Sequence, residues 1–244
     1  MPKPPGQISH KITQGFALII HNHEFDKMED RAGSEIDVEE IKRFCDLTGI
    51  HVHKTSKTEN LTATEIESLC TEVSERDFSR YDGFLCFILS HGKEEVILGV
   101  DGNEVSVQKI VSSFRGKPTL NGTPKLFFIQ ACRGSKSDYG VESDSYKVTQ
   151  LSQMRLPTDA DFLVAYSTAE GNESYRSREE GTWFITSLME NMHLHSHNMH
   201  LMDILTHVNQ QIATFTTSDG KKQMPCQMTT LTKFVYFGIP SPLT

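Results

Sequence analysis

A cysteine and a histidine each follow an apolar run of the kind that forms a buried strand. Cys132 comes shortly after Lys125–Ile129, and His91 comes shortly after Phe84–Leu89. The carboxyl ends of parallel strands are where open α/β sheets build their active sites. A thiolate is the nucleophile of cysteine chemistry, and a neighbouring imidazole makes or stabilises it. We therefore expect a Cys–His pair that carries out acyl transfer, provided that the two strands lie near each other in the sheet.

A glycine directly after the histidine adds a further element of this chemistry. Gly92 leaves its own backbone N–H open, and together with the amide of Cys132 it is expected to form an oxyanion hole. An isolated cysteine is ordinarily a small buried apolar residue. The surrounding pentapeptide Gln130-Ala131-Cys132-Arg133-Gly134 favours a nucleophile instead.

Composition excludes several classes of protein. The chain has 244 residues, enough for one large domain or two small ones, and a net charge of −8 that argues against nucleic acid or an anionic membrane as main partner. The longest uninterrupted apolar run, Phe84–Leu89, is too short to span a bilayer, and Met1–Gly6 lacks the apolar segment of a signal peptide. The five cysteines are odd in number and contain no pair separated by two residues, which predicts neither disulfides nor a zinc knuckle and favours a reducing cytoplasm.

The pattern along the chain predicts an α/β fold. Short apolar runs bounded by turns predict strands at Gly15–Ile20, Ile50–His53, Phe84–Leu89, Lys125–Ile129, Asp161–Ser167 and within Met228–Phe237. Apolar residues at helical spacing predict five helices, around Ile36–Cys45, Ile66–Val73, Val107–Phe114, Phe184–Met189 and Ile204–Ile212. Thr62 and Glu65 have the spacing of a capping box before the second helix. We expect one six-stranded, mainly parallel sheet with helices on both faces.

Two segments interrupt this alternation. Residues 1–13 are expected to be a short polar tail, and residues 135–153 are rich in Ser, Asp, Tyr and Lys without an apolar period. A long loop inside a compact domain is usually functional or disordered, and this one begins immediately after the cysteine pentapeptide.

The pentapeptide around Cys132 is the local signature of caspases, and other segments match that family in the same order from about residue 14 to residue 239. These segments are Arg31-Ala32-Gly33-Ser34, Ser90-His91-Gly92, Ala165-Tyr166-Ser167-Thr168, Ser174-Tyr175-Arg176, Gly181-Thr182-Trp183-Phe184 and Lys222-Gln223-Met224-Pro225. The chain thus resembles the caspase family. The resemblance implies a cysteine endopeptidase that cuts after aspartate through a thioester, acts in apoptosis and uses no metal or organic cofactor.

The resemblance also implies a role for each residue of the site. Cys132 attacks the carbonyl, His91 protonates the leaving amine, and the amides of Gly92 and Cys132 bind the oxyanion. The side chains of Arg31, Gln130 and Arg176 line the pocket for the aspartate. Two guanidiniums and one amide suit a carboxylate because they donate bidentate, charge-assisted hydrogen bonds.

Further residues are expected to bind the substrate before the aspartate. The resemblance implies that Ser174 and Arg176 pair with the substrate backbone as an added strand, and that Tyr175 and Trp183 line pockets further upstream. The loop of residues 214–220 is shorter than its counterpart in executioner caspases, which leaves selectivity at that end open. The substrate loop looks as much like that of apical death-receptor caspases, whereas the short amino-terminal tail favours an executioner.

The resemblance implies a division into two subunits. A large subunit of residues 14–144 and a small subunit of residues 145–244 would arise from a cut after Asp144, which precedes the small residue Ser145. Two such units would pair as a homodimer, and the region around Cys226 and Met228 resembles the seam between them.

Two alternatives and two plainer interpretations remain. An inactive caspase-like regulator would not need both Cys132 and His91, and a related peptidase that cuts after Arg or Lys would need an acidic pocket. The histidines at 193, 195, 197 and 200 lack the spacing of a zinc motif. The acidic run Glu35, Asp37, Glu39 and Glu40 complements the dipole at the start of a helix and requires no binding role.

Overall fold

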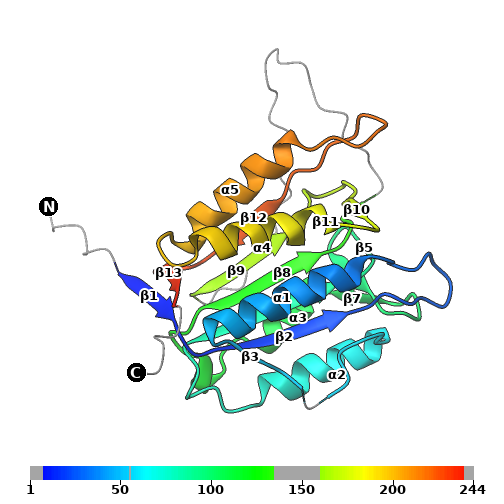
Figure 1. Cartoon of the computed structure of the whole chain (residues 1–244). Helices are drawn as coiled ribbons and strands as arrows, with labels where there is room; N and C mark the ends of the chain where they lie inside the picture. Colours follow the sequence, from blue (N-terminus) through cyan, green and yellow to red (C-terminus); the bar gives the residue numbers. More distant parts are fainter. Residues whose placement is uncertain (1–7, 55, 135–159, 239–244) are drawn as a thin grey trace, which may run out of the picture.

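A six-stranded sheet forms the centre of the molecule (Figure 1). The computed structural model describes residues 8–54, 56–134 and 160–238. The strand order is β12-β9-β8-β4-β2-β3, and all neighbours are parallel except β12, which runs antiparallel to β9. The strands are β2 (Gly15–His21), β3 (His51–Val52), β4 (Gly83–Leu89), β8 (Lys125–Gln130), β9 (Phe162–Tyr166) and β12 (Cys226–Thr229). The predicted α/β fold with a mainly parallel sheet is confirmed.

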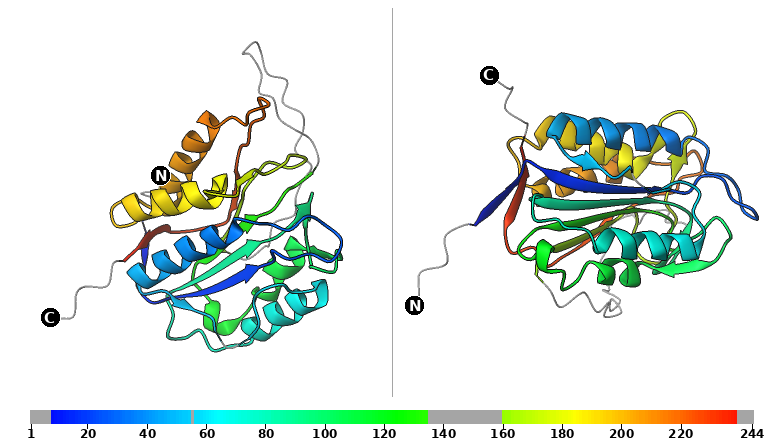
Figure 2. Two further views of the ribbon diagram at one scale, coloured as in Figure 1. Left: turned by 45° about the vertical axis from the view of Figure 1, so that its right-hand side comes forward. Right: turned by 90° about the horizontal axis from the view of Figure 1, so that it is seen from below.

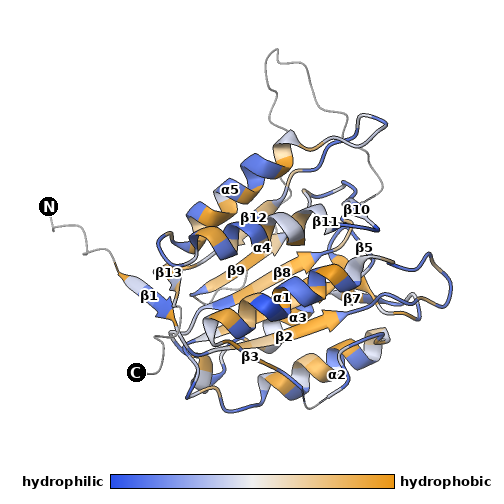
Figure 3. Cartoon of the chain, viewed as in Figure 1, coloured by the Kyte–Doolittle hydropathy of each residue, from blue (hydrophilic) through white to orange (hydrophobic). Residues whose placement is uncertain are grey.

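Helices cover both faces of this sheet, as Figure 2 shows most clearly in its right-hand view. The described residues form five α-helices: α1 (Ser34–Thr48), α2 (Ala63–Ser74), α3 (Val107–Ser113), α4 (Trp183–His195) and α5 (Leu201–Thr214). Residues such as Phe87 and Phe128 pack against α1, α4 and α5, whereas their neighbours Phe84 and Phe127 pack with α2 and α3. Because both faces are covered, the central strands are apolar without alternation, which Figure 3 displays as continuous hydrophobic ribbons.

Local signals position two of the helix ends. Thr62 accepts the backbone N–H of Glu65, and Glu65 accepts the N–H of Thr62, so the capping box predicted before α2 is confirmed. Helix α1 ends at Gly49, whose φ of 71° is the left-handed conformation that glycine adopts without strain. Within the described residues, no helix is long and apolar enough to cross a membrane.

The two ends of the chain differ from the sequence prediction. The last predicted strand is in fact two: β12 belongs to the main sheet, and β13 (Phe234–Phe237) pairs with β1 (Ser9–Ile12) in parallel. The expected polar tail is therefore wrong for residues 9–12. Only Ile12 is both apolar and fully buried there, and the strand's partner lies at the other end of the chain, so no local pattern reveals it.

The structure contains further short strands, near one end of the main sheet, that the sequence analysis did not predict. Strands β5 (Gly92–Lys93), β6 (Val96–Leu98) and β7 (Glu104–Ser106) form a small antiparallel sheet. Strands β10 (Arg176–Ser177) and β11 (Gly181–Thr182) form a hairpin before α4. The expected linker at 135–153, its cut after Asp144 and the first residues of the expected tail lie outside the described residues.

Candidate active site

The strands that precede the histidine and the cysteine are direct neighbours. In the pairing of β4 with β8, Leu89 lies opposite Gln130, so the two strands end in register. His91 and Cys132 each lie two residues beyond these positions, at the carboxyl edge of the sheet. The condition that the sequence left open, that the two strands be close, is met.

A hydrogen bond to a backbone carbonyl fixes the orientation of the His91 imidazole. Its Nε2 lies 2.7 Å from the carbonyl oxygen of Glu29, and its ring packs on Phe25 with centroids 4.6 Å apart. Because a carbonyl only accepts, Nε2 carries the proton and Nδ1 is the nitrogen left for chemistry. Burial lowers the pKa of His91, the hydrogen bond to Glu29 opposes this, and the charges of Arg31 and Arg176 lower it further.

Cys132 is half-buried and faces the segment before β10. Its Sγ accepts the backbone N–H of Ser174 at 3.5 Å. On the other side, Gly92 packs so tightly that a Cβ there would lie 2.8 Å from the carbonyl oxygen of Cys132. Only glycine permits this approach, which brings together the two backbone segments expected to supply the oxyanion amides.

Two arginines converge on the same end of the sheet. Arg31 is only 2% exposed, and its Nη1 donates to the carbonyl oxygen of Asn22 at 3.3 Å. Burial lowers the pKa of Arg31 to about 10, and the charge of Arg176 lowers it further, against the opposing effect of Asp37 and Cys132. A fully buried guanidinium beside a second one is a site prepared for an anion.

The third side chain expected in the aspartate pocket is that of Gln130, at the end of β8. Its Nε2 donates to the hydroxyl oxygen of Ser174 at 2.9 Å, and its Oε1 is buried without a partner among the described residues. Ser174 thus touches Gln130 through its side chain and Cys132 through its backbone.

Tyr175 and Trp183, the aromatic side chains expected upstream of the aspartate, contact each other in a tilted arrangement, and Phe215 meets Trp183 edge-on. The ring of Trp183 lies 5.2 Å from that of Tyr175 and 5.4 Å from that of Phe215, beside a cavity of about 440 Å³. Gln223, which sequence reasoning did not single out, accepts the N–H of Tyr175 at 2.7 Å and donates to the carbonyl oxygen of Ser167 at 2.8 Å. It lies within a segment that matched the family, which was the one signal available for it.

Comparison with known proteins agrees with this arrangement. The model of the caspase domain matches residues 14–236. The chain is 40% identical to caspase-3 of Bos taurus over 236 residues, which covers 91% of this chain and 84% of that protein. It is likewise 40% identical to caspase-3 of Mus musculus over 235 residues, covering 91% of this chain and 83% of the mouse protein. The chain belongs to the caspase family.

Caspases are cysteine endopeptidases that cut proteins after aspartate, and this caspase is such a hydrolase, acting in apoptosis. The predicted family, fold and activity are confirmed. Except for Asp144, every residue predicted for its site is described. Gln130 ends β8, His91 and Cys132 follow the ends of β4 and β8, and Ser174 contacts both Gln130 and Cys132. In the described part of the chain, no three His, Cys, Asp or Glu side chains form a group suited to a metal ion.

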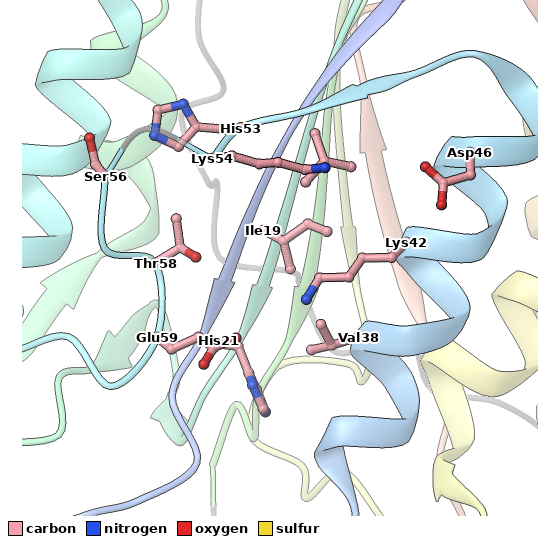
Figure 4. A pocket seen from close by; sticks show the side chains of 11 residues that line it. Ile19, His21, Val38, Lys42, Asp46, His53, Lys54, Ser56, Thr58 and Glu59 are labelled. Carbon is pink, nitrogen blue, oxygen red and sulfur yellow. The ribbon is translucent and has the colours of Figure 1, made fainter.

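A separate cavity of this caspase, about 350 Å³ in volume, lies beside α1, strand β2 and the edge strand β3 (Figure 4). Lys42 reaches from α1 into the space beside Ile19, and the charges of Lys42 and Lys54 are balanced by Asp46 and Glu59. None of the residues predicted for catalysis or substrate binding lines it. Its electrostatic neutrality favours no particular ligand.

One acidic residue departs from its sequence interpretation. Glu35 and Glu39 are exposed, as expected for carboxylates that only complement the dipole of α1. Asp37 is instead 1% exposed, and its Oδ1 accepts the backbone N–H of Thr182 at 2.9 Å. The sequence reasoning missed this contact because Thr182 is far away along the chain.

Proposed function

We propose that Cys132 is the nucleophile and His91 the proton carrier of this caspase. The observation that carries the proposal is the register of β4 and β8, whose ends bring the two residues to the same edge of the sheet. The hydrogen bond from His91 Nε2 to Glu29 supports it, because Nδ1 then remains available to the thiol.

The reaction proceeds in two acyl transfers. The Cys132 thiol gives its proton to His91, and Sγ attacks the carbonyl carbon of the residue before the cut. The N–H groups of Gly92 and Cys132 stabilise the resulting oxyanion. The imidazolium then protonates the amine as the C–N bond breaks, which leaves a thioester on Cys132. A water molecule, deprotonated by His91, hydrolyses this thioester and restores the thiol.

Arg31, Arg176 and Gln130 bind the aspartate carboxylate in this proposal. The burial of Arg31 and its electrostatic coupling to the half-buried Arg176 support it, since a buried guanidinium near a second one favours an anion between them. The unpartnered Oε1 of Gln130 fits the same role. The Ser174 hydroxyl can donate as well as accept. With the amide of Gln130 rotated, Oε1 would accept a hydrogen bond from this hydroxyl, and Nε2 would face the substrate.

Ser174 and Arg176 would pair with the substrate backbone, while Tyr175 and Trp183 contact side chains further upstream. Arg176 begins the two-residue strand β10, and Ser174 lies just before it, which supports the addition of an extended peptide there. The aromatic side chains of Tyr175, Trp183 and Phe215 favour apolar contact upstream.

We further propose cleavage after Asp144 into residues 14–144 and 145–244, and a homodimer of the cleaved units in the cytoplasm. Strand β12 ends the main sheet, and no described strand pairs with its outer edge, where Cys226 and Met228 are half-buried. Such an edge suits pairing with a second copy across a two-fold axis. All five cysteines are free thiols, which suits a reducing compartment.

The test compares two fluorogenic peptides that differ only in aspartate or arginine before the cut. The proposal requires the aspartyl peptide to be cleaved at least about 10³-fold more efficiently, because an arginine would bring a third positive charge into the pocket. Cleavage of neither peptide would identify an inactive regulator, and preference for arginine would contradict the pocket.

A further inference from the structure

Asp37 is a buried carboxylate that the catalytic roles above do not use. It lies in α1 at 1% exposure, and its Oδ2 has no hydrogen-bond partner within the described residues. A buried charge is costly unless it is paired or hydrogen-bonded, and a buried acceptor without a partner calls for an explanation. Complementing the dipole at the start of a helix does not require a carboxylate to be buried.

The other oxygen of Asp37 holds the hairpin that follows Ser174. Oδ1 accepts the N–H of Thr182 at 2.9 Å. It also contacts Gly181, whose φ is +84° and where a Cβ would lie only 2.5 Å from this oxygen. In the hairpin, Thr182 of β11 is the residue directly opposite Arg176 of β10. The carboxylate is thus attached to the backbone position that faces Arg176.

Asp37 is also the counter-charge of the arginine pair. The charges that act on its carboxylate are those of Arg31, from the loop before α1, and Arg176, from β10. Arg31 and Arg176 repel each other, and the negative charge of Asp37 opposes the effect of this repulsion on Arg31. None of the ion pairs among the described residues joins Asp37 directly to either guanidinium, and the Nη1 of Arg31 donates instead to the carbonyl oxygen of Asn22.

We propose that Asp37 is a positioning residue of the aspartate pocket: its buried negative charge holds Arg176, on the β10–β11 hairpin, in place opposite Arg31. Two guanidiniums and one buried carboxylate leave a single positive charge, which one substrate carboxylate neutralises. The inference rests on the proposed function, in which these two arginines bind the aspartate.

Ionised Asp37 reduces the stability of the fold. Burial raises its pKa to about 6, against hydrogen bonds from Thr182 and the attraction of the arginines, which lower it. The folded state therefore binds the proton more tightly than the unfolded chain, and the contribution of this group to stability is lost as pH rises toward 6. A neutral residue of the same shape should fold at least as well. A buried carboxylate kept at this cost indicates a functional role.

The experiment compares Asp37→Asn with Glu39→Gln, a matched loss of one carboxylate from the exposed side of the same helix. Four quantities are measured: kcat and KM for an aspartyl peptide, the ratio of efficiencies for aspartyl and glutamyl peptides, the Tm, and the rate at which iodoacetamide alkylates Cys132. For Asp37→Asn we expect KM to rise on the order of 10- to 100-fold and the aspartyl preference to shrink. The alkylation rate should stay unchanged and the Tm should be equal or higher. Glu39→Gln should match the wild type in all four.

The outcomes separate this inference from the proposed function. An Asp37→Asn enzyme with unchanged KM and unchanged aspartyl preference overturns the inference and leaves the proposed function intact. A fall in Tm, or failure to fold, also overturns it, because it would identify Asp37 as a structural residue. A wild type that does not cleave the aspartyl peptide overturns the proposed function, and the inference with it.

Discussion

Gln130 Nε2 donates to Ser174 Oγ over 2.9 Å, and this bond joins the end of β8 to the segment before β10. The two residues lie on opposite sides of Asp144, so after a cut there the bond would connect the large subunit to the small one. The thiol of Cys132, the proposed nucleophile, is next to the same junction, because the backbone N–H of Ser174 donates to Cys132 Sγ. In the proposed function, substrate recognition therefore depends on contacts between the two proposed subunits.

Replacing Arg176 tests the pocket at this junction. Arg176→Ala would leave the substrate carboxylate without one of its partners in a buried site, which costs about 2–5 kcal/mol. We expect kcat/KM for an aspartyl peptide to fall roughly 30- to several-thousand-fold, measured by steady-state kinetics. Arg31→Ala should behave alike, with an added loss of stability because its guanidinium also bonds Asn22.

Arg178 provides the control on the same hairpin. It is exposed, and its ion pair with Glu29 is exposed on both sides, so Arg178→Ala should change kcat/KM by less than about threefold. Equal effects of the two substitutions, or no effect of Arg176→Ala, would rule out the proposed carboxylate pocket.

Replacing Asp144 tests the processing site. Asp144→Ala should leave active preparations as an intact chain, whereas the wild type should yield fragments that end at Asp144 and begin at Ser145. Intact-mass spectrometry distinguishes them. Asp138→Ala is the control, since the bulky Tyr139 after Asp138 makes it a poorer site, and this variant should still be cut after Asp144. The same two fragments from Asp144→Ala would refute the assignment.

The sequence allowed prediction of the parts of the fold that depend on local pattern. The buried strands that end before His91 and Cys132 are continuous apolar runs, and helix α2 begins with a complete capping box made by Thr62 and Glu65. These features follow from neighbours a few residues apart. The pairing of these two strands joins segments that are distant in the chain, so the sequence could suggest this pairing but not establish it.

Several of the features missed depend on contacts between segments that are distant in the chain. Strand β1 contains a single buried apolar residue, and its partner β13 is at the opposite end of the chain. Asp37 looks like its acidic neighbours until Thr182 is seen against it. Gln223 supports Tyr175 through one hydrogen bond whose partner no periodic pattern indicates. Burial of a polar side chain is a property of the assembled fold.

The pH dependence of stability should reveal His21. Burial, followed by the charges of His23, Arg31 and Lys42, lowers its pKa to about 3. At low pH the unfolded chain therefore binds a proton at His21 that the folded state does not. The contribution of neutral His21 to stability is fully present above about pH 6.5 and is lost as pH falls toward 3. His21→Gln should reduce the slope of unfolding free energy against pH by up to about 1.4 kcal/mol per pH unit.

Denaturant unfolding at several pH values between about 4 and 7 measures these slopes. Asp37 has a raised pKa, so below about pH 6 its effect on the slope of stability against pH is opposite to that of His21. The variant and the wild type must therefore be compared with each other. The exposed His197 supplies the control, and His197→Gln should retain the wild-type slope. Identical slopes for His21→Gln and the wild type would show that His21 is protonated in the folded state.

The most direct test of the central claim is to trap the nucleophile. The wild type is treated with a peptide that carries an electrophilic ketone after its aspartate, and the modified residue is located by mass spectrometry. We expect one adduct per chain, on Cys132, with complete loss of turnover. Cys132→Ala should show neither adduct nor turnover, while Cys226→Ala, which removes the other half-buried thiol, should behave as the wild type. An adduct on another residue, or cleavage of aspartyl peptides by the Cys132→Ala protein, would contradict the assignment of Cys132 as the nucleophile.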